Sequence, residues 1–218
     1  MPGTVATLLI VDDEPAIRMS ISQVLTEIGY RVRSAEDGFA ALREIRTEVP
    51  ELLLSDLHMP GMSGFELLSV VRRRFPAIRT IAMSGAFSGN EVPSGVAADR
   101  FYQKGSSIVA LLRIMETLPQ LERPTHQPTS PDAPLWIHRN THDLSTDASL
   151  TITCPECLRT FPQTLGAGHL ERKTDCIHCR SSIHSVSGQS AERMPLHAVQ
   201  RKTAAAIPFQ RSASNSSY

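Results

Sequence analysis

The first half of the chain alternates between short apolar runs and stretches in which apolar residues recur at helical spacing. Five runs have the length and composition of strands, and they are TLLIVDD, RVRSA, ELLLSDL, TIAMSG and DRFYQK, which begin at residues 7, 31, 51, 80 and 99. Such alternation is typical of an α/β domain in which helices connect the strands of a parallel sheet and cover both of its faces. We therefore expect a five-stranded, doubly wound parallel sheet in this half.

Helices are expected in the intervals between these strands. Apolar residues within 17–28 fall on one helical stripe, and Gly29 follows as a stop signal. Similar stripes within residues 39–45, 65–75 and 108–115 predict three more helices. The connection SGNEVPSGVAAD, residues 88–99, differs because its two glycines and its proline disfavour a regular helix. We predict a short or broken helix there.

Composition divides the rest of the chain. Five prolines between Pro119 and Pro134 stand among polar residues without apolar periodicity, which is typical of a linker. We predict a domain at residues 5–121, a flexible linker at 122–149, a small module at 150–187 and a disordered tail at 188–218. Trp136 and Ile137 could dock on a neighbouring surface, but because most of the surrounding residues are polar we assign them to the loosely ordered linker.

The distribution of charge and the lengths of the apolar runs bear on the partner and the location that we expect for this protein. The formal net charge is zero, with 13 basic and 15 acidic residues in positions 1–123 against eight basic and four acidic residues from position 151 onward. This asymmetry permits an anionic partner for the C-terminal part. The start MPGTVATLLIVDD lacks the features of a secretory signal, and no apolar run approaches the length that crosses a bilayer. We expect a cytoplasmic protein without membrane insertion.

Polar side chains end four of the five predicted strands. They are Asp12 and Asp13 on the first strand, Asp56 on the third, Ser84 on the fourth and Lys104 on the fifth. Because the carboxyl ends of parallel strands meet at one edge of a sheet, we expect these side chains to converge. Two carboxylates about 4 Å apart repel by roughly 4 kcal/mol at an effective dielectric constant of about 20. A Mg²⁺ ion, which prefers oxygen ligands, would remove this repulsion.

This set of side chains suits phosphoryl chemistry. A carboxylate beside Mg²⁺ can attack a phosphoryl group to give an acyl phosphate, whose new oxygens then need a cation and a hydrogen-bond donor. Lys104 and Ser84 would supply them. The alternative is a solvated turn that carries its charges by chance.

The motifs VDDEP, LLSDLHMPGMSG, MSGA and FYQKG, in this order and spacing, resemble the receiver domain of bacterial two-component response regulators. The resemblance covers about residues 5–121 and implies a flavodoxin-like fold with strand order 2-1-3-4-5. It implies that Asp56 is the phosphoacceptor and that Asp12 and Asp13 hold Mg²⁺ directly or through water. The backbone carbonyl of His58 would be another magnesium ligand, and Gly64 belongs to the turn after the acceptor.

The same resemblance assigns the switch residues. Ser84 matches the hydroxyl that follows the phosphoryl group, and Phe101 matches the aromatic switch three residues before the lysine, Lys104. On phosphorylation, Ser84 and Phe101 are expected to move inward and the surface from residue 89 to residue 101 to change. Gly105 stands where the family usually has proline, so we expect a looser placement of Lys104. A receiver fold that has lost phosphorylation is the alternative.

All four cysteines of the chain lie in two C-x2-C pairs separated by eighteen residues, namely Cys154, Cys157, Cys176 and Cys179. Two such pairs can complete a tetrahedron of thiolates around a structural Zn²⁺, and the segment resembles a zinc ribbon. Disulfides, free thiols or a catalytic zinc are the alternatives. His169, His178 and His184 could compete as ligands, but we expect them to be exposed side chains.

These features predict a stand-alone response regulator that takes a phosphoryl group from a sensor histidine kinase or a phosphotransfer protein onto Asp56 and controls an unknown output partner. We expect no independent enzyme activity, because neither part carries a further acid, base or nucleophile set. The first alternative is a DNA-binding transcriptional regulator that acts through the zinc ribbon, which we favour less because the basic excess is small. The second is a phosphate sink or shuttle without its own output.

Overall fold

The computed structural model describes residues 6–87, 89, 91–93, 95–118, 134–138, 149–164 and 171–188. The described N-terminal part contains five strands and four helices. The strands are β1 (Thr7–Val11), β2 (Arg31–Ala35), β3 (Leu52–Asp56), β4 (Arg79–Ser84) and β5 (Arg100–Gln103). The helices are α1 (Pro15–Glu27), α2 (Gly38–Thr47), α3 (Gly64–Arg74) and α4 (Ile108–Thr117). We call this part the α/β domain.

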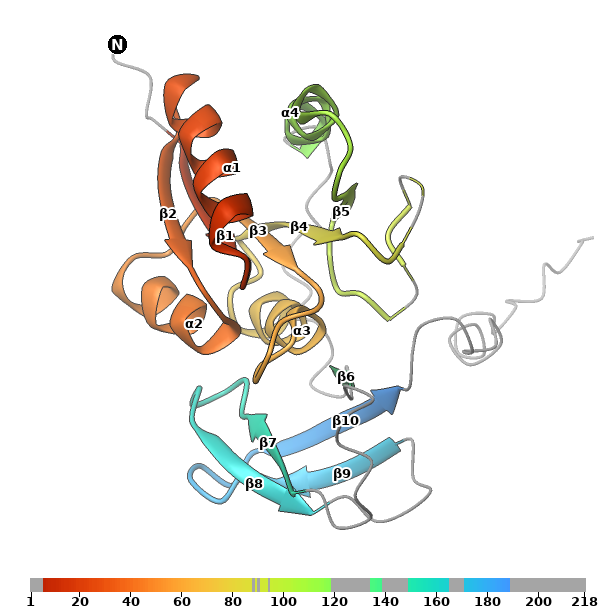
Figure 1. Ribbon diagram of the computed structural model, residues 1–218. Coiled ribbons are helices and arrows are strands. Elements are labelled where there is room, and N and C mark those ends of the chain that lie inside the picture. The colour runs from red at the N-terminus through yellow and green to blue at the C-terminus, as the bar shows by residue number, and fades with distance from the viewer. Residues whose placement is uncertain are drawn as a thin grey trace, which may run out of the picture.

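The five strands form one parallel sheet in the order β2-β1-β3-β4-β5, as predicted. Helices α1 and α4 cover one face of this sheet, and α2 and α3 cover the other (Figure 1). Successive residues of a strand point to opposite faces, so Leu8 and Ile10 pack in one apolar cluster while Leu9 and Val11 pack in the other. Burial on both faces explains why β1 and β3 are continuous apolar runs.

Local signals set the helix ends. The side chains of Asp37, Ser63 and Ser107 each accept a hydrogen bond from a backbone N–H in the first turn of α2, α3 and α4. After α1, Gly29 adopts a φ of +101°, a left-handed conformation that glycine reaches without steric cost. The predicted stop at Gly29 is therefore confirmed.

The connection between β4 and β5 contains no helix or strand among its described residues, 85–87, 89, 91–93 and 95–99. We call these residues the β4–β5 connection. Gly89 and Gly95 have φ values of +99° and +81°, which no right-handed helix accommodates. The predicted break is present, whereas the short helix that we considered is absent from these residues.

The described C-terminal residues form a second unit, which we call the β module. Its strands are β6 (Leu135–His138), β7 (Ser149–Thr153), β8 (Thr160–Thr164), β9 (Glu171–Asp175) and β10 (Ser182–Gly188). Strands β7 and β8 form an antiparallel pair, and a second sheet has the order β6-β10-β9. No helix in the described part of the chain is long and apolar enough to cross a membrane.

Strand β6 lies inside the segment that we predicted to be a linker, so the linker assignment is wrong for residues 135–138. Leu135 and Ile137 are 1% and 6% exposed, and β6 pairs in parallel with β10. Its pairing partner begins at Ser182, too far along the chain for a local pattern to reveal it. Ser149 and Gly188, which we placed in the linker and the tail, belong to β7 and β10. Residues 122–133 and 139–148 of the predicted linker and 189–218 of the predicted tail lie outside the described residues.

The β module packs against the α/β domain on the side of α3 (Figure 1). Buried residues of α2 and α3 and buried residues of the β module, such as Leu135, Ile152 and Phe161, belong to one continuous apolar cluster. The ring of Trp136 also packs against this cluster. The two units therefore share a core.

Glu66, in the first turn of α3, is a buried carboxyl group at this contact. Its side chain is 3% exposed, and its Oε1 accepts a hydrogen bond of 2.8 Å from the backbone N–H of Thr153 in β7. Burial raises the pKa of Glu66 to about 7, although the Thr153 N–H acts in the opposite direction. The β module thus keeps an acidic side chain away from water.

The buried carboxyl gives a pH-dependent stability. The usual pKa of Glu66 is 4.5, so the unfolded chain releases this proton at lower pH than the folded chain. As the pH rises from about 4.5 to about 7, the free energy of unfolding is expected to fall by about 3 kcal/mol relative to Glu66→Gln. Urea unfolding of both full chains between pH 5 and pH 8 measures the difference. Glu36→Gln, at an exposed position, is the control, and a Glu66→Gln difference that does not change with pH contradicts the assignment.

Candidate functional site

Three carboxylates meet at the carboxyl edge of the sheet, as predicted. Asp12 and Asp13 directly follow β1, and Asp56 is the last residue of β3. One carboxylate oxygen from each of them lies within 4.8 Å of the others. Asp12 and Asp56 are buried, whereas Asp13 is exposed. The site therefore has a closed inner side and one side open to solvent.

Lys104, immediately after β5, lies between two of these carboxylates. Its Nζ is 2.8 Å from Oδ2 of Asp12 and 2.8 Å from Oδ2 of Asp56. Burial raises the pKa of Asp56, with the nearby ammonium partly offsetting this effect. Burial lowers the pKa of Lys104, but hydrogen bonds to Asp12 and Asp56 outweigh it and raise that pKa overall. Three carboxylates and one ammonium leave a formal charge of −2, which a divalent cation would balance.

Ser84 and His58 form a second contact beside the acceptor. Ser84 ends β4 and is 1% exposed, its Oγ accepts a hydrogen bond from the Ala86 N–H, and it lies 3.2 Å from Nδ1 of His58. The imidazole stacks on Phe87, with ring centroids 5.9 Å apart. Sequence analysis assigned the His58 carbonyl to the magnesium site, and the structure adds the contacts of the His58 side chain with Ser84 and Phe87. The position of His58 two residues after Asp56 is the sequence signal that places it at the site.

Phe101 already occupies an inward position. Its ring is 1% exposed and meets the Phe87 ring edge-on, with centroids 6.3 Å apart. The structure therefore has Phe101 in the inward position. Its movement on phosphorylation stays a prediction.

Two glycines near the site matter for different reasons, Gly64 for its close packing and Gly105 for its backbone conformation. A Cβ on Gly64 would lie 1.9 Å from the backbone oxygen of Asp56, so the start of α3 packs directly on the acceptor residue. Gly105 has a φ of +86°, which the proline ring prohibits. Lys104 nevertheless makes both ion pairs, so the looser placement that we expected is not seen.

Comparison with known protein families identifies the domain that carries the three carboxylates and Lys104. Residues 8–109 match the family model of the response regulator receiver domain. These residues form a receiver domain. The match ends before the β module begins.

Several relatives share the receiver. The DNA-binding transcriptional regulator NtrC of Klebsiella pneumoniae is 35% identical over 97 residues, which are 44% of this chain and 19% of that protein. The nitrogen assimilation regulatory protein NtrX of Azorhizobium caulinodans is 38% identical over 93 residues, 42% of this chain and 20% of that protein. This chain thus spans about one fifth of the length of these two regulators.

Solved structures are similar over the same region. The crystal structure of response regulator protein TrrA from Thermotoga maritima, in complex with Mg²⁺ and BeF, has 30% sequence identity and a TM-score of 0.49. It covers 52% of this chain and 99% of that one.

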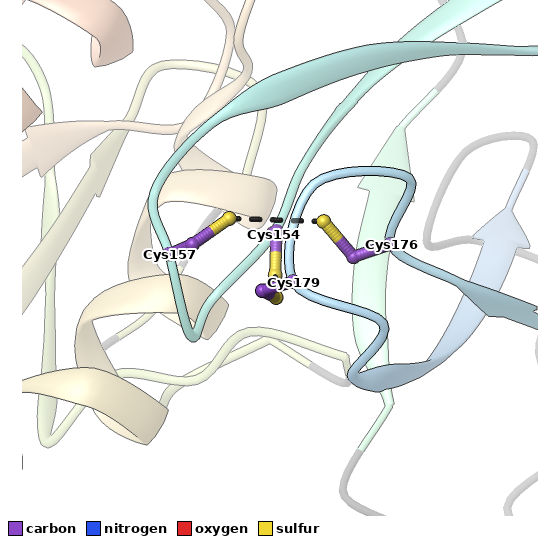
Figure 2. A group of neighbouring side chains, drawn as sticks. All are labelled: Cys154, Cys157, Cys176 and Cys179. Atoms are coloured by element: carbon purple, nitrogen blue, oxygen red, sulfur yellow. Dashed lines mark hydrogen bonds between the residues drawn. The ribbon is translucent and has the colours of Figure 1, made fainter.

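Outside the receiver, the β module brings the four cysteines together (Figure 2). Sγ of Cys154 and Cys179 are 3.6 Å apart, and Sγ of Cys157 and Cys176 are 3.7 Å apart. Four thiolates around Zn²⁺, with bonds of about 2.3 Å, lie about 3.8 Å from one another, whereas a disulfide needs about 2.05 Å. All four cysteines are free. The spacing therefore fits a tetrahedral metal and not a pair of disulfides.

The two cysteine pairs have the same backbone conformation. The residues after each pair, Leu158 and Arg180, have φ values of +56° and +63°. The N–H of each donates a 2.8 Å hydrogen bond to the carbonyl of the first cysteine in its pair, Cys154 or Cys176. Left-handed backbone at non-glycine residues costs roughly 1 kcal/mol or more each, so the tertiary structure must hold both loops. The C-x2-C spacing alone gave no signal for these two residues.

The thiols of this group differ in their acidity. Burial raises the pKa of the Cys154 thiol to about 12. Hydrogen bonding to the side chain and backbone of Ser181 lowers the pKa of Cys179 to about 6. A metal that binds all four as thiolates must therefore displace protons, above all from Cys154.

Two of the three histidines considered as competing ligands have other partners. Nε2 of His178 is 3.1 Å from the carbonyl oxygen of Thr160, and Nε2 of His184 is 3.8 Å from Oε2 of Glu171. His169 lies outside the described residues. Among the described residues, the candidate metal group in the β module therefore consists of sulfur atoms alone.

Proposed function

We propose that this protein is a response regulator of a two-component phosphorelay and accepts a phosphoryl group on Asp56 from a sensor histidine kinase or a phosphotransfer protein. The observation that carries the proposal is the position of the Asp56 carboxylate in a receiver domain, next to both the Lys104 ammonium and the Asp12–Asp13 pair. The proposal places the protein in the cytoplasm, where its phosphoryl donors act.

In the proposed reaction, a carboxylate oxygen of Asp56 attacks the phosphorus atom of a phosphohistidine. A P–O bond forms, the P–N bond breaks, and its electron pair stays on the histidine nitrogen of the donor. Lys104 neutralises charge on the phosphoryl oxygens, since its Nζ is already 2.8 Å from Asp56. Ser84 would donate a hydrogen bond to another oxygen after its hydroxyl turns away from His58.

The acidic group suits Mg²⁺ because three hard oxygen ligands lie within 4.8 Å of one another and their excess charge is −2. Asp12, Asp13, Asp56 and the backbone carbonyl of His58 would hold the ion. When bound there, Mg²⁺ would neutralise negative charge on the transferred group.

For the β module we propose a structural Zn²⁺ held by Cys154, Cys157, Cys176 and Cys179. Support comes from the sulfur spacing and from the shared conformation of the two loops. Four thiolates close the coordination shell, which favours a structural role over a catalytic one. We propose no independent enzyme activity and an output that depends on partner interactions.

Phosphorylation is tested with acetyl phosphate and Mg²⁺. We expect the mass of one phosphoryl group on the intact chain, and its loss in Asp56→Asn because the amide cannot attack phosphorus. Glu116→Gln, at an exposed acid, should be labelled as well as the wild type. Intact-mass spectrometry measures the adduct, and labelling that persists in Asp56→Asn refutes the assigned acceptor.

Metal content tests the cysteine centre. We expect about one zinc per chain after dialysis, and a large loss in Cys157→Ser because one of four ligands is removed. His178→Ala should retain the metal, since its ring contacts the Thr160 carbonyl instead. Elemental analysis measures the ratio. Zinc-free wild-type protein that keeps a folded β module argues against the proposal.

A further inference from the structure

Helix α3 presents a row of polar side chains to the β module. The contacts are Glu66 with the Thr153 N–H at 2.8 Å, Ser69 Oγ with the Trp136 N–H at 3.3 Å, and Arg73 Nε with Glu156 Oε1 at 3.0 Å. Positions 66, 69 and 73 follow helical spacing and lie on one face. Each contact therefore pairs the same helix face with a different part of the β module.

This face of α3 is buried although the opposite face already packs on the sheet. All residues from Gly64 to Val71 are buried. A helix that is buried all round needs a neighbour on each side, and here the second neighbour is the β module. The buried Glu66 carboxylate accepts its hydrogen bond from the β module, and Ser69 Oγ, which donates to the Phe65 carbonyl at 2.8 Å, accepts a second one from it. The fit therefore involves polar groups as well as apolar ones.

The β4–β5 connection forms the other wall of this contact. A Cβ on Gly95 would lie 3.1 Å from the ring of Trp136, so the ring rests directly on the glycine backbone. Val92, Val96 and Ala97 pack against the same apolar cluster as Trp136. The docked position of β6 thus depends on the conformation of this connection.

The connection also reaches the phosphoacceptor site. Phe87 lies in the same apolar cluster and stacks on His58, which in turn contacts Ser84 Oγ. The hydroxyl of Ser84 that would donate to a phosphoryl oxygen on Asp56 is thus the same group that contacts His58. We expect its turn toward the phosphoryl group to weaken a contact that holds His58 and Phe87 in place.

We propose that the face formed by α3 and the β4–β5 connection is an intramolecular docking surface for the β module, and that phosphorylation of Asp56 weakens this docking. The β module is then the output element of its own receiver, and its release uncovers this face of α3 together with Trp136. This inference rests on the proposed phosphorylation of Asp56. By linkage, the docked β module in turn disfavours the phosphorylated state.

Trp136 is the one tryptophan in the chain, so its fluorescence reports docking directly. With the zinc-loaded full chain, addition of beryllofluoride and Mg²⁺ should shift the emission to the red and raise acrylamide quenching by about twofold or more, as the undocked population grows. Asp56→Asn should show neither change. An unchanged or blue-shifted emission in the wild type overturns the proposal.

Two glycine variants test the surface itself. Gly95→Leu should give the red-shifted, strongly quenched emission before any beryllofluoride is added, because its side chain occupies the space of the Trp136 ring. Gly89→Leu is the matched control, since it also has a positive φ but no atom within 4 Å of a Cβ. It should behave as the wild type, and equal emission from the two variants contradicts the docking surface.

Acetyl phosphate labelling of the same samples separates two kinds of failure. Labelled wild-type protein whose emission does not change leaves the proposed function intact and overturns the docking switch. Unlabelled wild-type protein overturns both.

Discussion

Charge compensation at the carboxyl edge of the sheet is the interaction on which the site depends. Burying Asp12 and Asp56 beside each other is costly, and two ion pairs of 2.8 Å from Lys104 offset part of that cost. The remaining formal charge of −2 favours a divalent cation at this site. The parallel sheet makes this possible because it brings the ends of β1, β3, β4 and β5 to one edge.

Residues at this edge of the sheet pack directly on α3 and, through side chains, on the β4–β5 connection. Gly64 lets α3 begin against the Asp56 carbonyl, and the opposite face of α3 carries the β module. His58 and Phe87 connect the acceptor site to the β4–β5 connection on the other side. Only a few residue contacts therefore separate Asp56 from the surface on which the β module is docked.

Much of this arrangement could be predicted from local sequence. Short apolar runs located all five strands of the α/β domain and helical apolar spacing located its four helices, and strand-end position brought Asp12, Asp56 and Lys104 together. The contacts that escaped prediction join residues far apart, such as Glu66 with Thr153, 87 positions away. Strand β6 was missed for the same reason, since its four residues acquire a partner only when β10 is in place. The left-handed backbone of Leu158 has no signal in the sequence.

Calorimetric titration of the full chain with Mg²⁺ tests the compensation directly. The account predicts uptake of one Mg²⁺ per chain by the wild type and a large loss of affinity in Asp13→Asn, which removes a ligand at the exposed side of the site and leaves both Lys104 ion pairs in place. A wild-type chain that takes up no Mg²⁺ at millimolar concentration, or an Asp13→Asn variant that binds it equally well, would contradict the account.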